Sequence, residues 1–134
     1  MKTIKLVLLI CFIGVTFNCK AQQFQELNLE TNIIGTWILD DDPLIKNVFT
    51  TSGKYLRYYK NALRYTGTYS IGTSCKGQTI IDDDDIFLRI TSTSIEFGDT
   101  ICYYINTINT DSSGVITLSL TSAGRGRLVV FTKQ

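Results

Sequence analysis

The side chains best suited to contact a ligand lie close together in one stretch of the chain. Residues 55–69 contain five tyrosines and two arginines, namely Tyr55, Tyr58, Tyr59, Tyr65 and Tyr69 with Arg57 and Arg64. A tyrosine offers a large apolar ring and one hydroxyl, which suits a binding pocket or a face that contacts a sugar or a peptide. The structural alternative places Tyr65 and Tyr69 in the core and the others on the outer flank of the fold.

The chain contains no histidine, which excludes much of enzyme chemistry. Catalysis by Ser-His-Asp or Cys-His groups, His-ligated metal sites and imidazole acid–base chemistry near neutral pH are all impossible. Carboxylates remain, but Asp40, Glu96 and Asp99 cannot be paired across a cleft from their spacing. Gly124-Arg125-Gly126 lacks the strand-loop-helix setting of a phosphate loop. We therefore expect no catalytic residues, no cofactor and no enzymatic activity.

Two acidic runs raise the question of calcium. Asp82 to Asp85 are consecutive, and consecutive residues of an extended chain point to opposite sides, so four of them cannot converge on one ion. A solvated turn is the preferred interpretation, with weak surface calcium as the alternative. Asp40-Asp41-Asp42 is interpreted in the same way, as a turn that ends a strand, with Pro43 stopping the pairing after it. No metal site is predicted.

The first residues have the pattern of an export signal. Lys2 and Lys5 precede an uncharged apolar segment over residues 6–17, which is too short to span a bilayer but suits a signal peptide. Three outcomes are considered. Cleavage after Ala21 is favoured, lipidation of Cys19 is the alternative, and an uncleaved anchor is the third. Thr16-Phe17-Asn18 before the cysteine departs from the usual lipoprotein pattern.

The expected division of the chain is a signal peptide over 1–21, a linker or short helical turn over 22–32 and one domain over 33–134. Removal of Lys2, Lys5 and Lys20 changes the balance from 13 basic and 12 acidic residues to 10 and 12, a net charge of −2. No basic stripe remains to neutralise phosphates, so nucleic acid is not an expected partner. A membrane contact is expected only through a lipid at Cys19.

Cys75 and Cys102 are the two thiols of the expected domain, because Cys11 and Cys19 belong to the signal region. In an exported protein such a pair is most simply a structural disulfide. A catalytic pair is usually spaced Cys-x-x-Cys, and this one is not. Tyr103 and Tyr104 are expected to pack around the bridge.

The rest of the domain is predicted to consist of short strands. Residues 63–71 alternate between apolar or glycine positions and polar positions, the pattern of a strand with one buried face. Similar runs, rich in Ile, Val, Thr, Tyr and Phe, occur over 33–39, 47–51, 54–59, 78–81, 86–91, 101–108, 115–121 and 127–133. Turn-forming residues separate these runs.

Eight or nine strands joined by short loops predict an all-β antiparallel meander. An up-and-down barrel is favoured over a small sandwich, because closure removes exposed strand edges. The alternation predicts inward side chains in four strands, at Trp37 with Leu39, Tyr65 with Tyr69, Ile86 with Leu88 and Ile90, and Ile116 with Leu118 and Leu120.

The segment Gly35-Thr36-Trp37 resembles the Gly-x-Trp signature on the first strand of lipocalins. Gly67-Thr68-Tyr69 and a final strand ending in Phe131-Thr132-Lys133 are similar to features of small bacterial lipocalin-like proteins. The resemblance covers about residues 33–134 and implies a calycin-type barrel in which the tryptophan closes one end. It also implies a late arginine packed across that tryptophan, a role for Arg125 or Arg127.

Two functions follow as expectations. The first is an exported, non-enzymatic binding protein that takes a small apolar or amphipathic ligand, with Trp37, Tyr55, Tyr58, Tyr65 and Tyr69 as candidate binding residues. The second is a filled barrel that acts as a structural or protein-interaction module at the cell envelope. The short length and the missing C-terminal helix favour the second. An apolar lumen of roughly 300 Å³ or more would support ligand binding, whereas a lumen packed with side chains would contradict it.

Overall fold

The computed structural model describes residues 28–77, 85–93 and 99–134. The predicted signal peptide, Cys19, most of the linker, the predicted strand 78–81 and Asp82 to Asp84 lie outside the described residues. A helical turn over 28–32 leads into the first strand, and the Ile33 N–H donates to the Leu29 carbonyl. This agrees with the helical turn expected at the end of the linker.

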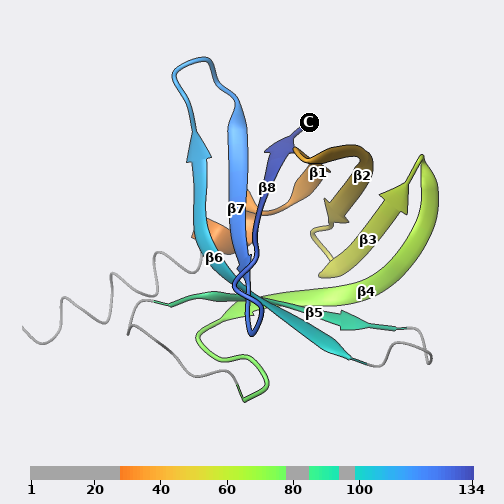
Figure 1. Ribbon diagram of the computed structural model, residues 1–134, viewed down its shortest axis with the longest axis vertical. Coiled ribbons are helices and arrows are strands. Elements are labelled where there is room, and N and C mark those ends of the chain that lie inside the picture. The colour runs from red at the N-terminus through yellow and green to blue at the C-terminus, as the bar shows by residue number, and fades with distance from the viewer. Residues whose placement is uncertain (1–27, 78–84, 94–98) are drawn as a thin grey trace, which may run out of the picture.

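The described residues form eight strands. In chain order these are β1 (Gly35–Leu39), β2 (Asp42–Phe49), β3 (Lys54–Tyr59), β4 (Ala62–Gly72), β5 (Phe87–Ser92), β6 (Thr100–Thr110), β7 (Ile116–Ser122) and β8 (Leu128–Lys133). Each strand pairs antiparallel with the next, and β8 pairs with β1 to close the sheet into a barrel (Figure 1). The prediction of an up-and-down barrel rather than a sandwich is confirmed.

Strand β2 corrects one prediction. It begins at Asp42 and contains Pro43, whereas the sequence was interpreted as a strand from residue 47 preceded by a proline that stops pairing. The ladder with β1 shifts register between Ile38 and Leu39, so residues 43–45 fall in an irregular part of the pairing. A proline is tolerated there because no ladder hydrogen bond requires its missing N–H.

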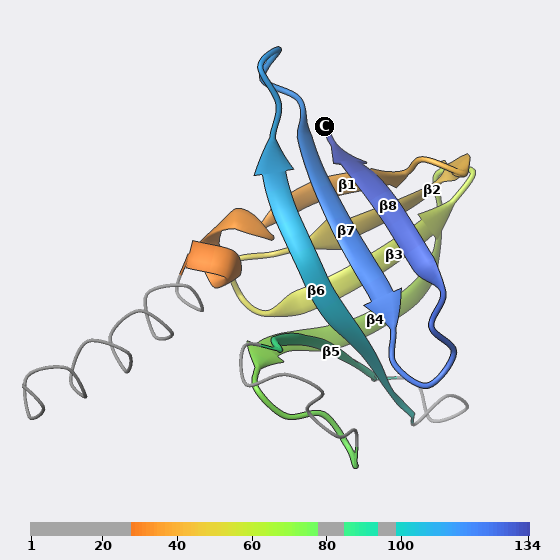
Figure 2. The ribbon, with the colours of Figure 1, turned by 60° about the vertical axis from the view of Figure 1, so that its left-hand side comes forward.

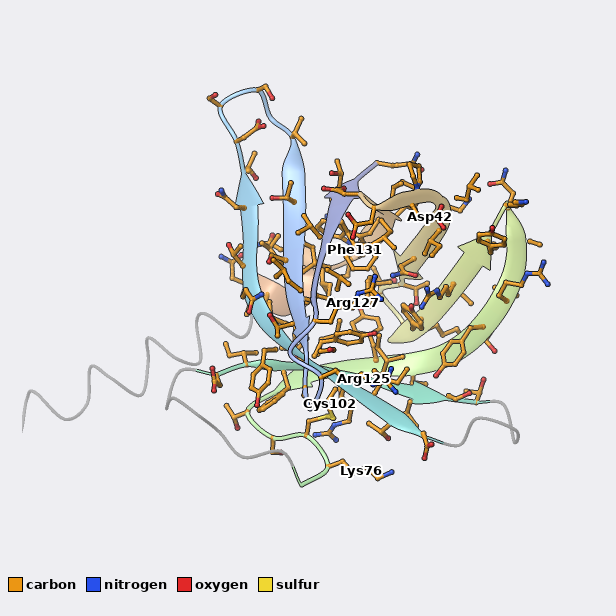
Figure 3. The ribbon with its side chains drawn as sticks, viewed as in Figure 1. Asp42, Lys76, Cys102, Arg125, Arg127 and Phe131 are labelled. Carbon is orange, nitrogen blue, oxygen red and sulfur yellow. A yellow bond between two sulfur atoms is a disulfide. The ribbon has the colours of Figure 1, made fainter. Side chains whose placement is uncertain are left out.

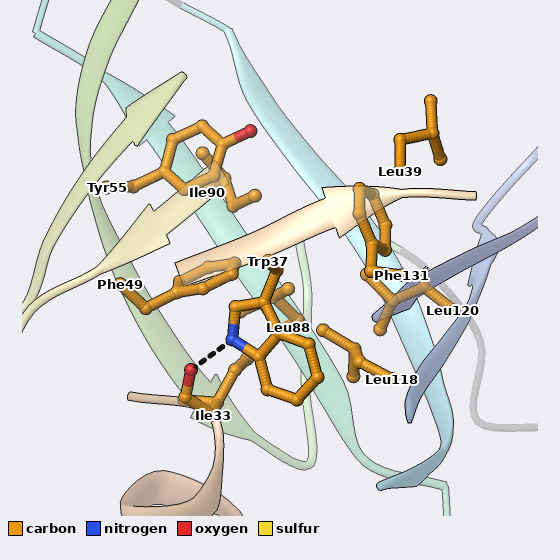
Figure 4. Close-up of a cluster of buried hydrophobic side chains, with 10 residues drawn as sticks. All are labelled: Ile33, Trp37, Leu39, Phe49, Tyr55, Leu88, Ile90, Leu118, Leu120 and Phe131. Carbon is orange, nitrogen blue, oxygen red and sulfur yellow. Dashed lines mark hydrogen bonds between the residues drawn. The ribbon is translucent and has the colours of Figure 1, made fainter. Parts of the chain in front are cut away.

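The alternating side chains fill one large hydrophobic core inside the barrel (Figure 4). Its buried members are Ile33, Trp37, Leu39, Phe49, Tyr55, Leu88, Ile90, Leu118, Leu120 and Phe131. Tyr65, Tyr69 and Ile116 are partly buried against this core, as the alternation predicted. Ile86 is also buried, although it lies outside this cluster.

A second, smaller cluster covers the outer face of β5 and β6. Cys75 and Cys102 form the predicted disulfide, with 6.0 Å between their Cα atoms, and both pack against Phe87. Phe87 must point outward, because Leu88 next to it points into the core. The disulfide therefore fastens the chain after β4 over the outside of the barrel.

The two ends of the barrel differ, and we name them by what lies there. The closed end carries the helical turn 28–32, the start of β1 and the β2–β3 turn. The open end carries the β1–β2 and β3–β4 turns and the loop between β7 and β8. Figure 2 shows the helical turn, in orange, on the side of the barrel away from the β1–β2 and β3–β4 turns.

Candidate functional site

Trp37 plugs the closed end of the barrel. Its side chain is fully buried, and its indole Nε1–H donates to the Ile33 carbonyl oxygen at 2.7 Å (Figure 4). Ile33 directly follows the helical turn and is also fully buried. The tryptophan therefore seals this end and fixes the entry of the chain into β1.

Lys133, and not Arg125 or Arg127, lies across the tryptophan. The Lys133 ammonium is 5.1 Å from the centroid of the Trp37 ring and donates to the Asn32 carbonyl oxygen at 2.9 Å. The expectation of a late arginine at this position was wrong. β8 pairs Lys133 with Trp37, so this lysine is the cation that the strand order brings to the closed end.

Gly35 explains why the first strand needs a glycine two residues before the tryptophan. Its φ is +135°, and a Cβ at this position would lie 2.7 Å from the Lys133 Cε. Lys133 could move away from a new Cβ, but the backbone conformation would remain strained for any residue with a side chain. The glycine of the Gly-x-Trp pattern therefore allows the backbone conformation with which β1 begins.

A cavity of about 280 Å³ opens at the other end of the barrel. One part of its wall is apolar and consists of Leu39, Ile45, Ile90, Leu120, Val129 and Phe131. The cavity is slightly smaller than the pockets that take drug-sized ligands, which begin near roughly 300 Å³. It therefore suits a small ligand, or part of a longer one.

The remaining wall of the cavity is polar and strongly basic. It contains Asn47, Tyr55, Tyr103 and Ser122, and the arginines Arg57, Arg125 and Arg127. The arginines are exposed at the mouth, whereas Tyr55 and Asn47 are buried below it. Figure 3 shows Arg125 and Arg127 on the loop between β7 and β8. The cavity thus has an apolar side and a polar mouth.

A tyrosine–asparagine pair forms the buried polar part of the wall. The Tyr55 hydroxyl donates to the Asn47 Oδ1 at 3.0 Å across the β2–β3 ladder. Burial raises the pKa of Tyr55 well above its usual value, while the positive charge of Arg57 partly opposes this shift. Tyr55 is therefore a neutral donor at physiological pH.

The five predicted ligand-binding residues lie in different parts of the barrel and do not form one site. Tyr55 lines the cavity, whereas Trp37 fills the closed end. Tyr65 packs edge-on against Tyr55, with 5.7 Å between the ring centroids. Tyr69 packs against Phe49 at 5.0 Å and donates its hydroxyl to the Thr50 carbonyl oxygen. Burial raises the pKa of Tyr69.

Tyr58 lies on the outer face of β3. The Lys46 ammonium is 4.9 Å from the centroid of its ring, and the two residues are paired across β2 and β3. Of the five candidates, only Tyr55 contributes to the cavity wall.

Several residues of the cavity wall were not among the candidate binding residues. Arg57 was named with the tyrosine cluster but not as a candidate, although it is two residues after Tyr55 on β3 and alternation places both on one face. Tyr103 was expected beside the disulfide, but it follows Cys102 directly and therefore points to the opposite face, where it lines the cavity. Tyr104 packs against the disulfide cluster as expected.

The aspartates at the open end have structural roles. Asp40 Oδ1 accepts from the Thr132 hydroxyl at 2.8 Å, and Asp42 Oδ1 accepts from the Leu44 N–H at 3.1 Å. Asp85, the one described member of the second acidic run, lies before β5 at the closed end of the barrel. Within residues 28–77, 85–93 and 99–134, no group of three or more metal-ligating side chains is placed to hold an ion.

None of the helical residues that the structure describes belongs to a helix long and apolar enough to cross a membrane. Comparisons with models of protein families, with curated proteins and with solved structures find no match to this chain. The conclusions about this site therefore rest on its own geometry.

Proposed function

We propose that this protein is an exported, non-enzymatic, lipocalin-like barrel that binds a small amphipathic ligand in the cavity at its open end. The observation that carries this proposal is the cavity of about 280 Å³ with an apolar side and a polar mouth. The apolar side accepts a hydrocarbon group, and the polar groups at the mouth hold a head group near water. At the opposite end, the described interior is filled by the fully buried side chains of Trp37 and Ile33.

The lipocalin-like assignment is supported by the strand order and by the first strand. Eight antiparallel strands close in sequence order, and Trp37 seals the end at which β1 begins. A basic side chain, Lys133, lies across its ring. These features agree with the resemblance carried by Gly35-Thr36-Trp37.

Export is supported by the disulfide, because such bridges persist mainly in oxidising compartments. The signal pattern over residues 1–21 leads to the same proposal. Intact mass of the exported protein distinguishes its two forms. A chain beginning at Gln22 would indicate simple cleavage, and a diacylglyceryl mass on Cys19 would indicate a lipid anchor.

Native mass spectrometry of the protein purified from its own host tests ligand binding directly. We expect an additional mass that is lost on denaturation.

A variant that fills the cavity tests whether the ligand binds there, with decan-1-ol as an uncharged amphiphilic probe. Val129 lines the cavity, whereas the neighbouring Val130 points to the outer face of β8. We expect Val129→Trp to abolish decan-1-ol binding, measured by calorimetry, and Val130→Trp to preserve it. Equal binding by both variants would contradict the proposal.

A second candidate function is a protein-interaction module, favoured by apolar side chains around the open end. Leu44, Leu63, Ile101 and Leu128 are each more than two-fifths exposed, and each lies near the open-end terminus of its strand. A photo-crosslinking residue at Leu128 would test this candidate in intact cells. A single crosslinked protein, abolished by Leu63→Lys, would favour it over ligand binding as the main role of the open end.

A further inference from the structure

We propose that the ligand of the open-end cavity carries a negatively charged head group, held by Arg57, Arg125 and Arg127. This inference rests on the proposed function and names the class of ligand, an anionic amphiphile with a hydrocarbon chain. Three guanidinium groups at one mouth are the observation behind it.

The arginines approach the cavity from two separate elements. Arg57 projects from β3, and Arg125 and Arg127 belong to the loop between β7 and β8. Because strands β3 and β8 are not neighbours in the barrel, these groups lie on different parts of the wall. A head group at the mouth would therefore be contacted from more than one side.

The β7–β8 loop is built to present its two arginines. Gly124 and Gly126, which alternate with them, have positive φ angles of +87° and +63°. These conformations strongly favour glycine. The Arg127 N–H donates to the Ser122 hydroxyl at 3.1 Å, and the Ser122 N–H donates to the Arg127 carbonyl at 2.9 Å. The base of the loop is thus fixed where Arg127 enters the cavity wall.

The charges at the mouth are not balanced within the described part of the chain. No described aspartate or glutamate lines the cavity, and none of the described carboxylates forms an ion pair with these three arginines. Like charges around one cavity mouth repel one another, and a bound anion reduces that repulsion. A guanidinium has five donors and no acceptor, so it selects an acceptor such as a carboxylate or phosphate.

The interior beside Arg57 also contains a buried hydroxyl without a partner. The Tyr65 hydroxyl is buried and makes no hydrogen bond in the structure. Tyr65 is paired with Arg57 across β3 and β4, and its ring packs on that of the cavity residue Tyr55. A buried hydroxyl without an acceptor is costly, and it adds to the excess of donors on this side of the barrel.

The apolar wall indicates that the other part of the ligand is a hydrocarbon chain. Leu120, Val129 and Phe131 line the cavity below the exposed guanidinium groups. A hydrocarbon chain would lie against these side chains, while its head group stays at the mouth near water. A free inorganic anion would contact the arginines but leave the apolar wall without a ligand group.

Four probes separate the contributions of charge and chain, measured by isothermal titration calorimetry of the oxidised protein. Decanoate has both the charge and the chain, decan-1-ol has the chain alone, decylammonium reverses the charge, and inorganic phosphate has charge alone. We expect decanoate to bind at least about 10-fold more tightly than each of the others, as one or more charge-assisted hydrogen bonds would give. This preference should shrink as salt is added.

Substitutions identify the groups responsible. Arg57→Gln and Arg127→Gln should each weaken decanoate binding about 5-fold, the scale expected of an exposed ion pair with good geometry. Decan-1-ol binding by the same variants should be unchanged, which also shows that they are folded. Arg64→Gln is the matched control, because Arg64 is exposed on β4 and does not line the cavity. It should leave all affinities unchanged.

The outcomes separate this inference from the proposed function. Equal binding of decanoate, decan-1-ol and decylammonium would overturn the anionic head group and leave the binding function standing. Phosphate binding as tight as that of decanoate would overturn the hydrocarbon chain. Loss of decanoate affinity in Arg64→Gln as large as in Arg57→Gln would show a nonspecific charge effect and overturn the site. Failure of all three decyl probes to bind would overturn the proposed function itself.

Discussion

The two ends of the barrel are formed by the same eight strands but contain very different side chains. At the closed end, Trp37 and Ile33 are fully buried, and Lys133 connects the ring to the helical turn. At the open end, the interior is left with a cavity whose mouth carries Arg57, Arg125 and Arg127. One end is therefore tightly packed, and the other contains the cavity that we propose binds the ligand. The following predictions test that division, beginning with the largest expected effect.

Trp37→Ala should cause the largest loss of stability. It removes a fully buried ring and the hydrogen bond to Ile33. We expect the free energy of unfolding to fall by about 4 kcal/mol, as for other large aromatic truncations in cores. Urea unfolding followed by far-UV circular dichroism measures this. Trp37→Phe, which retains most of the ring, should lose less than half as much. A loss below about 1 kcal/mol for Trp37→Ala would contradict the role given to the closed end.

The disulfide stabilises the barrel from outside, where Ala123 of the β7–β8 loop packs against it. Replacing Cys75 and Cys102 by serine should lower the free energy of unfolding by about 3.5 kcal/mol, the chain-entropy value for the 27-residue separation of the two cysteines. Unfolding of the wild-type protein in dithiothreitol should match that of the variant. Identical urea midpoints for the oxidised and reduced proteins would show that the bridge contributes nothing.

Two glycines allow a matched test of backbone space. Gly35→Ala should cost about 2 kcal/mol, because its φ of +135° is a conformation that residues with a side chain rarely adopt. Gly72→Ala on β4 should be nearly neutral, since nothing lies within 4 Å of its Cβ position. Thermal unfolding of both variants measures the difference. Similar melting temperatures for the two would contradict the requirement for glycine at position 35.

Tyr55 lies between the core and the cavity and should make stability depend on alkaline pH. Burial raises its pKa in the folded protein, whereas a tyrosine in the unfolded chain has a pKa of about 10. Above that pH the unfolded chain binds fewer protons than the folded one, so stability falls as pH rises. The slope from this residue is about 1.4 kcal/mol per pH unit. Urea unfolding at several pH values between 9 and 11 gives the free energy of unfolding at each pH. This free energy should fall less steeply with pH in Tyr55→Phe than in the wild-type protein. An equally steep fall in both would refute the burial of a neutral hydroxyl.

The sequence predicted the strands and their inward side chains well because apolar and polar residues alternate clearly there, whereas the closure by Trp37 came from the resemblance to lipocalins. Trp37 with Leu39, and Leu118 with Leu120, follow the period of two that a half-buried strand requires. The disulfide was also predictable, since only Cys75 and Cys102 remain outside the signal region. These features depend on local pattern or on elimination.

The open end was harder to predict because its residues come together through the closure of the barrel. In β3 both faces carry tyrosines, so the pattern does not show which face is inside. The register shift between Arg57 and Tyr58 further obscures the pairing with β4. Arg125 and Arg127 lie in a loop, whose side-chain direction no strand period sets. They line the same cavity as Arg57 only because the eight strands close into a barrel.

A nuclear magnetic resonance titration of the ¹⁵N-labelled protein with decanoate tests the central claim most directly. We expect the amide shift changes to concentrate at cavity residues such as Tyr55, Leu120 and Val129. The amide resonances of Ile33 and Trp37 at the closed end should not shift. Saturable changes confined to the first group would support a binding cavity at the open end. Changes centred on Ile33 and Trp37, or no saturable change at all, would contradict it.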